Sequence, residues 1–154
     1  MKVICVALFL VFTFVAPSFA DPKPLGFELG KASYSQMASK YEMVKEKPLP
    51  GMDVDVYEIN PKSTGLRYIE KVTAIFNKKS LLMSVIMIYP RTYFDSLYRQ
   101  LVSKYKVIYS HLPVVGTKYV RFIDGNTVII LKQPYLKYTT TVIYVRKELL
   151  VPPR

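Results

Sequence analysis

The sequence predicts an α+β fold, in which one mostly antiparallel sheet of six or seven strands carries two helices packed on one face. Two observations support this prediction. Seven short runs are rich in β-branched and aromatic residues and are separated by turn-forming residues. Two amphipathic segments, each opening with a residue able to cap a helix, precede groups of these runs. Because a sheet and an amphipathic helix each have one apolar face, packing them together buries both.

The first helix is expected to begin after Ser33, because Ser33 and Gln36 have capping-box spacing. Its apolar positions recur at helical intervals, at Tyr34, Met37, Ala38 and Tyr41. The second helix is expected after Thr92 as its cap, with Asp95 in the first turn, where a negative charge suits the helix dipole. Its apolar stripe consists of Phe94, Leu97, Tyr98, Leu101, Val102 and Tyr105.

The seven predicted strands are connected by recognisable turns. They cover residues 54–59, 66–76, 81–89, 106–109, 118–123, 127–131 and 136–145. Asn77 to Ser80 and Asp124-Gly125-Asn126 each predict a hairpin turn. The run 81–89 is apolar apart from Ser84, which favours a central strand with both faces largely covered. Residues 45–51, which contain two prolines and a glycine, are expected to form a loop.

Residues 1–20 predict a secretory signal peptide, cleaved after Ala20. Lys2 provides a positive start, residues 3–16 form an apolar run, and Ser18 and Ala20 are the small residues that precede a cleavage site. The apolar run is fourteen residues long, shorter than the ~18–20 that a membrane-spanning helix needs. An uncleaved N-terminal anchor is the alternative.

Export would leave a chain without thiols. Cys5, the one cysteine, lies within the predicted leader and has no lipoprotein-like context, so neither a disulfide nor a lipid anchor is expected. Residues 21–150 are long enough for a single domain with an ordinary core. Residues 151–154 are expected to form a loose tail.

Two pairs of segments suggest an internal repeat. Residues 39–44 (SKYEMV) resemble residues 103–108 (SKYKVI), and residues 84–89 loosely match residues 140–145. The chain would then consist of half-repeats 27–90 and 91–148, each with a helix followed by three or four antiparallel strands. The alternative is a coincidence of a common element order.

A short opening segment also suggests a family. Residues 27–36 (FELGKASYSQ) place a glycine, a serine cap and a short helix in succession. This opening, with the element order, resembles small exported domains of the outer-membrane assembly lipoprotein type (SmpA/OmlA) and the tandem β-lactamase inhibitor proteins. The resemblance implies an exported α+β fold. The lipidated cysteine of the lipoproteins is missing, so membrane anchoring does not carry over.

Catalytic chemistry finds little support in the sequence. His111 is the single histidine, no nucleophile motif surrounds it, and zinc would need several His or Cys ligands. Asp53 and Asp55, with Glu58 nearby, could form an acid–base pair or bind calcium, or form a solvated acidic edge. No phosphate-binding glycine loop is present. No cofactor or metal is expected.

Charge and tyrosines instead indicate binding. Residues 21–90 have a charge balance of +2 and residues 91–154 of +8, and the chain contains thirteen tyrosines. We therefore expect an exported, non-catalytic binding protein that engages an acidic protein or an anionic envelope component. The candidate surface residues are Lys118, Tyr119, Arg121, Lys132, Tyr135, Lys137, Tyr138 and Arg146.

Three other functions remain as alternatives to this prediction. They are an unfamiliar secreted enzyme that uses the acidic cluster or His111, an inhibitor or toxin-like module, and a solvated basic surface without a partner. Cations and rings alternate as on single-strand nucleic-acid surfaces, but export makes nucleic acid an unexpected target.

Overall fold

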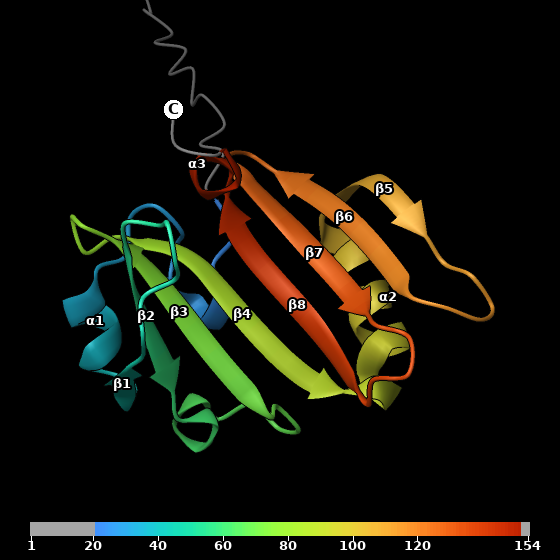
Figure 1. Ribbon diagram of the computed structural model, residues 1–154, viewed down its shortest axis with the longest axis horizontal. Helices are drawn as coiled ribbons and strands as arrows, with labels where there is room; N and C mark the ends of the chain where they lie inside the picture. The colour runs from blue at the N-terminus through green and yellow to red at the C-terminus, as the bar shows by residue number, and fades with distance from the viewer. Residues whose placement is uncertain (1–20, 152–154) are drawn as a thin grey trace, which may run out of the picture.

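The chain forms one eight-stranded antiparallel sheet with two helices against one face (Figure 1). The computed structural model describes residues 21–151, so the predicted signal peptide and the last three residues of the predicted tail lie outside it. The strand order is β1-β2-β3-β4-β8-β7-β6-β5. The strands are β1 (Met43–Lys45), β2 (Val54–Ile59), β3 (Lys71–Asn77), β4 (Leu82–Pro90), β5 (Lys106–His111), β6 (Lys118–Asp124), β7 (Thr127–Gln133) and β8 (Thr139–Arg146).

The α+β class with a mostly antiparallel sheet is confirmed, but the predicted number of strands is wrong. All seven predicted runs contain strands, and β1 is an additional short edge strand beside β2. The α-helices are α1 (Tyr34–Ala38), α2 (Phe94–Lys104) and a single turn, α3 (Lys147–Leu150), which was not expected. Three 3-10 turns complete the described chain, at η1 (Pro24–Gly26), η2 (Pro61–Thr64) and η3 (Arg91–Tyr93). None of these helices is long and apolar enough to cross a membrane.

The topology has two similar halves. A helix followed by four strands occurs twice, and the two four-strand groups meet where β4 pairs with β8. Residues 39–44 and 103–108 occupy corresponding positions, from the end of a helix into the first strand of each half. Residues 84–89 and 140–145 lie in the two central strands. The duplication of an ancestral half stays a prediction.

The core lies between the sheet and helices α1 and α2, on what we call the helix-covered face. Met37 of α1 packs with Val72, Phe76 and Val85 in one buried cluster. In the second half, Phe94 and Leu101 of α2 pack with residues of β6, β7 and β8. Tyr89 and Tyr144, from the two central strands, contact both clusters and join them. Burial raises the pKa of Tyr144 and of Tyr89, as expected for phenols packed between two apolar clusters.

The two helix starts differ from each other. At α1 the predicted capping box is confirmed. The backbone N–H of Gln36 donates to Ser33 Oγ (3.2 Å), and the backbone N–H of Ser33 donates to Gln36 Oε1 (2.9 Å). The predicted cap at Thr92 is wrong. Residues Arg91–Tyr93 form η3, and α2 follows from Tyr93 without a side-chain cap. The Pro90–Tyr93 segment therefore turns the chain before the helix begins.

The predicted strand 66–76 begins too early. Residues before Lys71 lie outside β3, because Gly65 and Tyr68 both adopt left-handed backbone conformations (φ +69° and +65°) that interrupt extended structure. Leu66 and Tyr68 are exposed as a result. This connection lies at the end of the sheet where β2 ends and β3 begins.

Candidate binding surface

The sheet face opposite α1 and α2 is largely uncovered, and we call it the open face. Strand register brings residues from seven strands into one row across it, in the order Glu58, Thr73, Ile86, Ile143, Ile130, Arg121 and Tyr109. A neighbouring row consists of Lys71, Ile88, Thr141, Lys132, Tyr119 and His111. The face therefore changes from an acidic residue at one side, through isoleucines, to cations and rings at the other.

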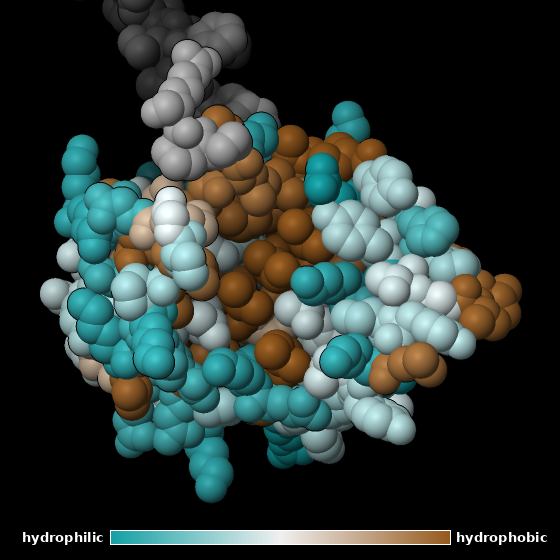
Figure 2. Space-filling view, viewed as in Figure 1, coloured by the Kyte–Doolittle hydropathy of each residue, from teal (hydrophilic) through white to brown (hydrophobic). Residues whose placement is uncertain are grey.

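An apolar strip occupies the middle of the open face. Ile86, Ile88, Ile130 and Ile143 come from the central strands and are only half-buried. Leu149 of α3 covers one end of this face, where it packs against Val54, Val56 and Ile75. Figure 2 shows the strip as a hydrophobic band running down from α3, with hydrophilic residues on its left and mixed polar residues on its right.

Residues 81–89 are predicted to form a central strand with both faces largely covered, and in the structure the two faces are covered to different degrees. Val85 and Met87 are buried under the helices, whereas Ile86 and Ile88 face outward on the open face. Apolar side chains at all positions but Ser84 indicate that the strand is central. They do not show that both faces are covered, because an uncovered apolar face has the same composition.

A cationic, aromatic cluster borders the strip on β5, β6 and β7. Arg121 Nη2 donates to Tyr119 Oη (3.1 Å), and the Arg121 guanidinium lies 5.8 Å from the Tyr119 ring centroid. Tyr109 contacts Tyr119 edge to face, with centroids 5.9 Å apart. Lys132 is paired with Tyr119 across the β6–β7 ladder. Within residues 21–151, neither Arg121 nor Lys132 forms an ion pair with an acidic side chain. These cations are therefore available to an external carboxylate.

The remaining predicted site residues lie elsewhere. Lys118 is next to Tyr119 in sequence but faces the helix side of the sheet, where its Nζ lies 5.1 Å from the centroid of Phe94. Tyr135, Lys137 and Tyr138 are exposed in the β7–β8 connection. The eight predicted residues are thus divided among the open face, the helix-covered face, the β7–β8 connection and an ion-pair network. Only Tyr119, Arg121 and Lys132 share the open face.

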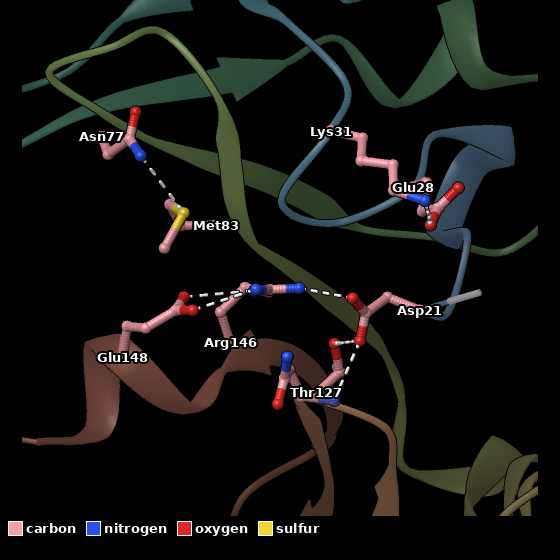
Figure 3. Close-up of polar contacts among 9 residues, drawn as sticks. Asp21, Glu28, Lys31, Asn77, Met83, Thr127, Arg146 and Glu148 are labelled. Atoms are coloured by element: carbon pink, nitrogen blue, oxygen red, sulfur yellow. Dashed lines mark hydrogen bonds and ion pairs between the residues drawn. The ribbon is translucent and has the colours of Figure 1, made fainter. Parts of the chain in front are cut away.

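Arg146 is held inside a polar network (Figure 3). Its guanidinium bonds the carboxylate of Asp21 on one side and that of Glu148 on the other, with Nη2–Oε1 and Nε–Oε2 distances to Glu148 of 2.9 and 3.1 Å. The Arg146 side chain is only 14% exposed. The ion pair lowers the pKa of Glu148. Arg146 therefore joins the N-terminal segment of the domain to β8, and its guanidinium is already bonded to two carboxylates.

The acidic side chains that the sequence offers for catalysis or calcium binding form ion pairs with lysines. Asp55 lies 3.2 Å from Lys45 Nζ and 3.6 Å from Lys78 Nζ, and Lys78 also pairs with Asp53 (3.4 Å). These contacts, the Lys45 hydrogen bond first, lower the pKa of Asp55. A carboxyl with a lowered pKa is a poor general acid near neutral pH. Glu58 pairs instead with Lys71 on the open face, at 3.1 Å.

His111 lies exposed at the end of the edge strand β5, beside Tyr119 in the second row of the open face. No group of three potential metal-binding side chains is found in the described part of the chain.

Sequence reasoning missed five residues of this surface. Tyr109 and the four isoleucines of the strip lie within predicted strands, and the sequence predicts no surface role for them. Alternation along each strand was the available signal for them, since residues of one parity share a face. Only the pairing of strands distant in sequence shows that these residues lie side by side.

Comparison with known proteins found no relatives. No family model, no curated protein and no solved structure matches this chain.

Proposed function

We propose that this chain is an exported, non-catalytic binding protein that holds an acidic partner protein on the open face of its sheet. The observation that carries this proposal is the apolar strip bordered by Tyr109, Tyr119, Arg121 and Lys132. Protein interfaces combine an apolar centre with Tyr and Arg, and exposed apolar patches of this kind mark interaction sites.

Charge favours an acidic partner over a neutral one. Glu58, the one acidic residue in the two rows, is paired with Lys71, whereas Arg121 and Lys132 have no acidic partner in the described chain. Arg121 is held by Tyr119, which pre-orients its guanidinium and reduces the ordering cost of binding a carboxylate. The expected partner therefore presents apolar side chains next to Asp or Glu.

Affinity capture tests this proposal. The chain from Asp21 onward is immobilised and exposed to envelope extract of the producing organism at low and at moderate salt. We expect it to retain an acidic protein whose capture weakens with salt. Arg121→Glu combined with Lys132→Glu should reduce the affinity about tenfold or more, because both cations then repel the partner.

The matched control is Lys47→Glu combined with Lys79→Glu, which makes the same charge change on two exposed lysines at the other end of the sheet. This control should still capture the partner. Equal loss in both double variants would reduce the proposal to non-specific charge attraction. Loss of activity in cells through Asp53→Ala with His111→Ala, while Arg121→Glu with Lys132→Glu has no effect, would favour the enzyme alternative.

A further inference from the structure

Beyond the open face, one end of the sheet collects exposed apolar side chains on three connected segments. They are residues 66–68, before β3; residues 112–117, between β5 and β6; and residues 134–138, between β7 and β8. We call them together the loop rim. They meet because the antiparallel register places Lys71 beside Ile88, Lys118 beside Gln133, and Pro90 beside Thr139.

Contacts join the three segments into a continuous surface. The Tyr135 N–H donates to Thr117 Oγ1 (3.0 Å), which connects the second segment to the third. The Arg91 N–H donates to the carbonyl of Tyr138 (2.8 Å), which connects the third segment to η3. Tyr68 stacks on Tyr93 of η3 with ring centroids 5.2 Å apart, which adds the first segment.

The rim is far more apolar than the rest of the exposed surface. Of the fifteen large hydrophobic residues that are exposed within residues 21–151, eight belong to these three short segments. The aliphatic members protrude most: Val114 is fully exposed, Val115 is 71% exposed and Leu136 is 77% exposed. Figure 2 shows hydrophobic atoms projecting at the right-hand end, where Figure 1 has the β5–β6 connection.

The loop rim contains positively charged side chains and no negatively charged ones. The three segments contain Arg67 and Lys137 and no Asp or Glu, while the acids at this end, Glu70 and Asp95, lie outside them. Tyr68, Tyr135 and Tyr138 are exposed beside the cations. Protruding aliphatic side chains, amphipathic rings and long cationic side chains fit the acyl, interfacial and headgroup layers of an anionic bilayer.

We propose that the loop rim binds the surface of an anionic phospholipid bilayer, with Val114 and Val115 inserted below the headgroups. A bilayer fits this rim better than a protein does, because Val114 and Val115 protrude with most of their surface exposed and a fluid surface accommodates them without a complementary pocket. The open face would remain accessible to its own partner while the rim is bound, since the two surfaces use different residues.

Vesicle binding tests the proposal. The chain from Asp21 is used, because residues 21–151 contain all eight strands and the buried clusters of this domain. It should co-sediment with vesicles of phosphatidylglycerol and phosphatidylcholine and not with phosphatidylcholine alone. Val114→Ser with Val115→Ser should weaken binding about tenfold or more. Arg67→Gln with Lys137→Gln should weaken it by a similar factor.

Matched controls use the other end and edge of the sheet. Val44→Ser removes a valine that is 66% exposed on β1, and Lys47→Gln with Lys79→Gln removes two exposed charges. Both controls should bind as the wild type does. Absence of wild-type binding to the anionic vesicles, or equal loss in controls and rim variants, overturns the proposal. Capture of the acidic partner by the Val114/Val115 variant reports separately on the open face.

Insertion can be measured directly by fluorescence. Because the chain contains no tryptophan, a single introduced tryptophan reports on its own surroundings. In Val115→Trp the single indole should emit at shorter wavelength when anionic vesicles are added, whereas Val44→Trp should not change. An unchanged emission from Val115→Trp on bound vesicles would contradict insertion.

Discussion

Arg121 and Arg146 are both arginines of the basic half of the chain, yet their surroundings differ. Arg121 is exposed and hydrogen-bonded to Tyr119 on its own sheet face, whereas Arg146 is 14% exposed and bonded to two carboxylates. A guanidinium already neutralised by Asp21 and Glu148 has little capacity left for an external anion. The identity of a residue thus specifies a charge, and its neighbours decide whether that charge is available.

Asp21 is expected to contribute strongly to stability. Its carboxylate accepts from Arg146, from the Asn126 N–H (3.0 Å) and from Thr127 Oγ1 (3.2 Å), and its side chain is 12% exposed. Asp21→Ala leaves these donors unpaired and should lower the free energy of unfolding by about 2–3 kcal/mol. Equilibrium unfolding in urea measures the change.

Asp53→Ala is the control for this prediction, because Asp53 also forms an ion pair but its side chain is 84% exposed. Its effect should stay within about 0.5 kcal/mol. Similar effects of the two substitutions would show that the Asp21 network does not hold the N-terminal segment to β8.

At the scale of the element, helix α2 shows how far periodicity predicts packing. Phe94 and Leu101 of the predicted stripe are buried against the sheet, while Val102 of the same stripe is exposed. A sheet contacts only part of a helix surface, so the outermost residue of a wide stripe stays in solvent. The apolar pattern located the helix, and the contact with β7 and its neighbours selected the buried positions.

Neighbouring residues of α2 give an internal test. Leu101→Ala should lower the free energy of unfolding by about 3 kcal/mol, because it creates a cavity in the second buried cluster. Val102→Ala should change it by less than about 0.5 kcal/mol. Thermal and urea unfolding of the two variants would measure the difference, and a comparable effect at both positions would contradict the packing described for this helix.

At the scale of the whole molecule, the two halves share a single sheet and a joined core. Strands β4 and β8 pair in the middle, and Tyr89 and Tyr144 contact the buried clusters of both halves. Neither half can therefore expose its central strand without disturbing the other. The edges differ from the centre: β1 has three residues, and β5 is exposed along almost its whole length.

Native-state hydrogen exchange should reflect this organisation. We expect the slowest backbone amides in β4, β8 and β7, with one common opening free energy, and the fastest in β1 and β5. Mass spectrometry of exchanged fragments would measure these rates. Distinct opening free energies for β4 and β8 would mean that the halves unfold as independent units, contrary to the joined core.

The local part of this structure could be predicted from the sequence alone. The seven strand runs, the two amphipathic helices, the Ser33 capping box and the Asp124–Asn126 turn all follow from residues within a few positions of each other. Lysines and tyrosines in the second half also predict a binding surface, which stays a prediction, and three of the eight residues named for it, Tyr119, Arg121 and Lys132, share the open face.

Only the tertiary structure decided which residues act together. Strand order, the open face, the loop rim and the burial of Arg146 depend on contacts between residues far apart in the chain, such as Ile86 with Ile143 or Asp21 with Arg146. A sequence pattern records that a residue is apolar or charged. Whether a helix, a carboxylate or solvent lies against that residue is settled when distant segments pack, since this packing determines which groups lose their water.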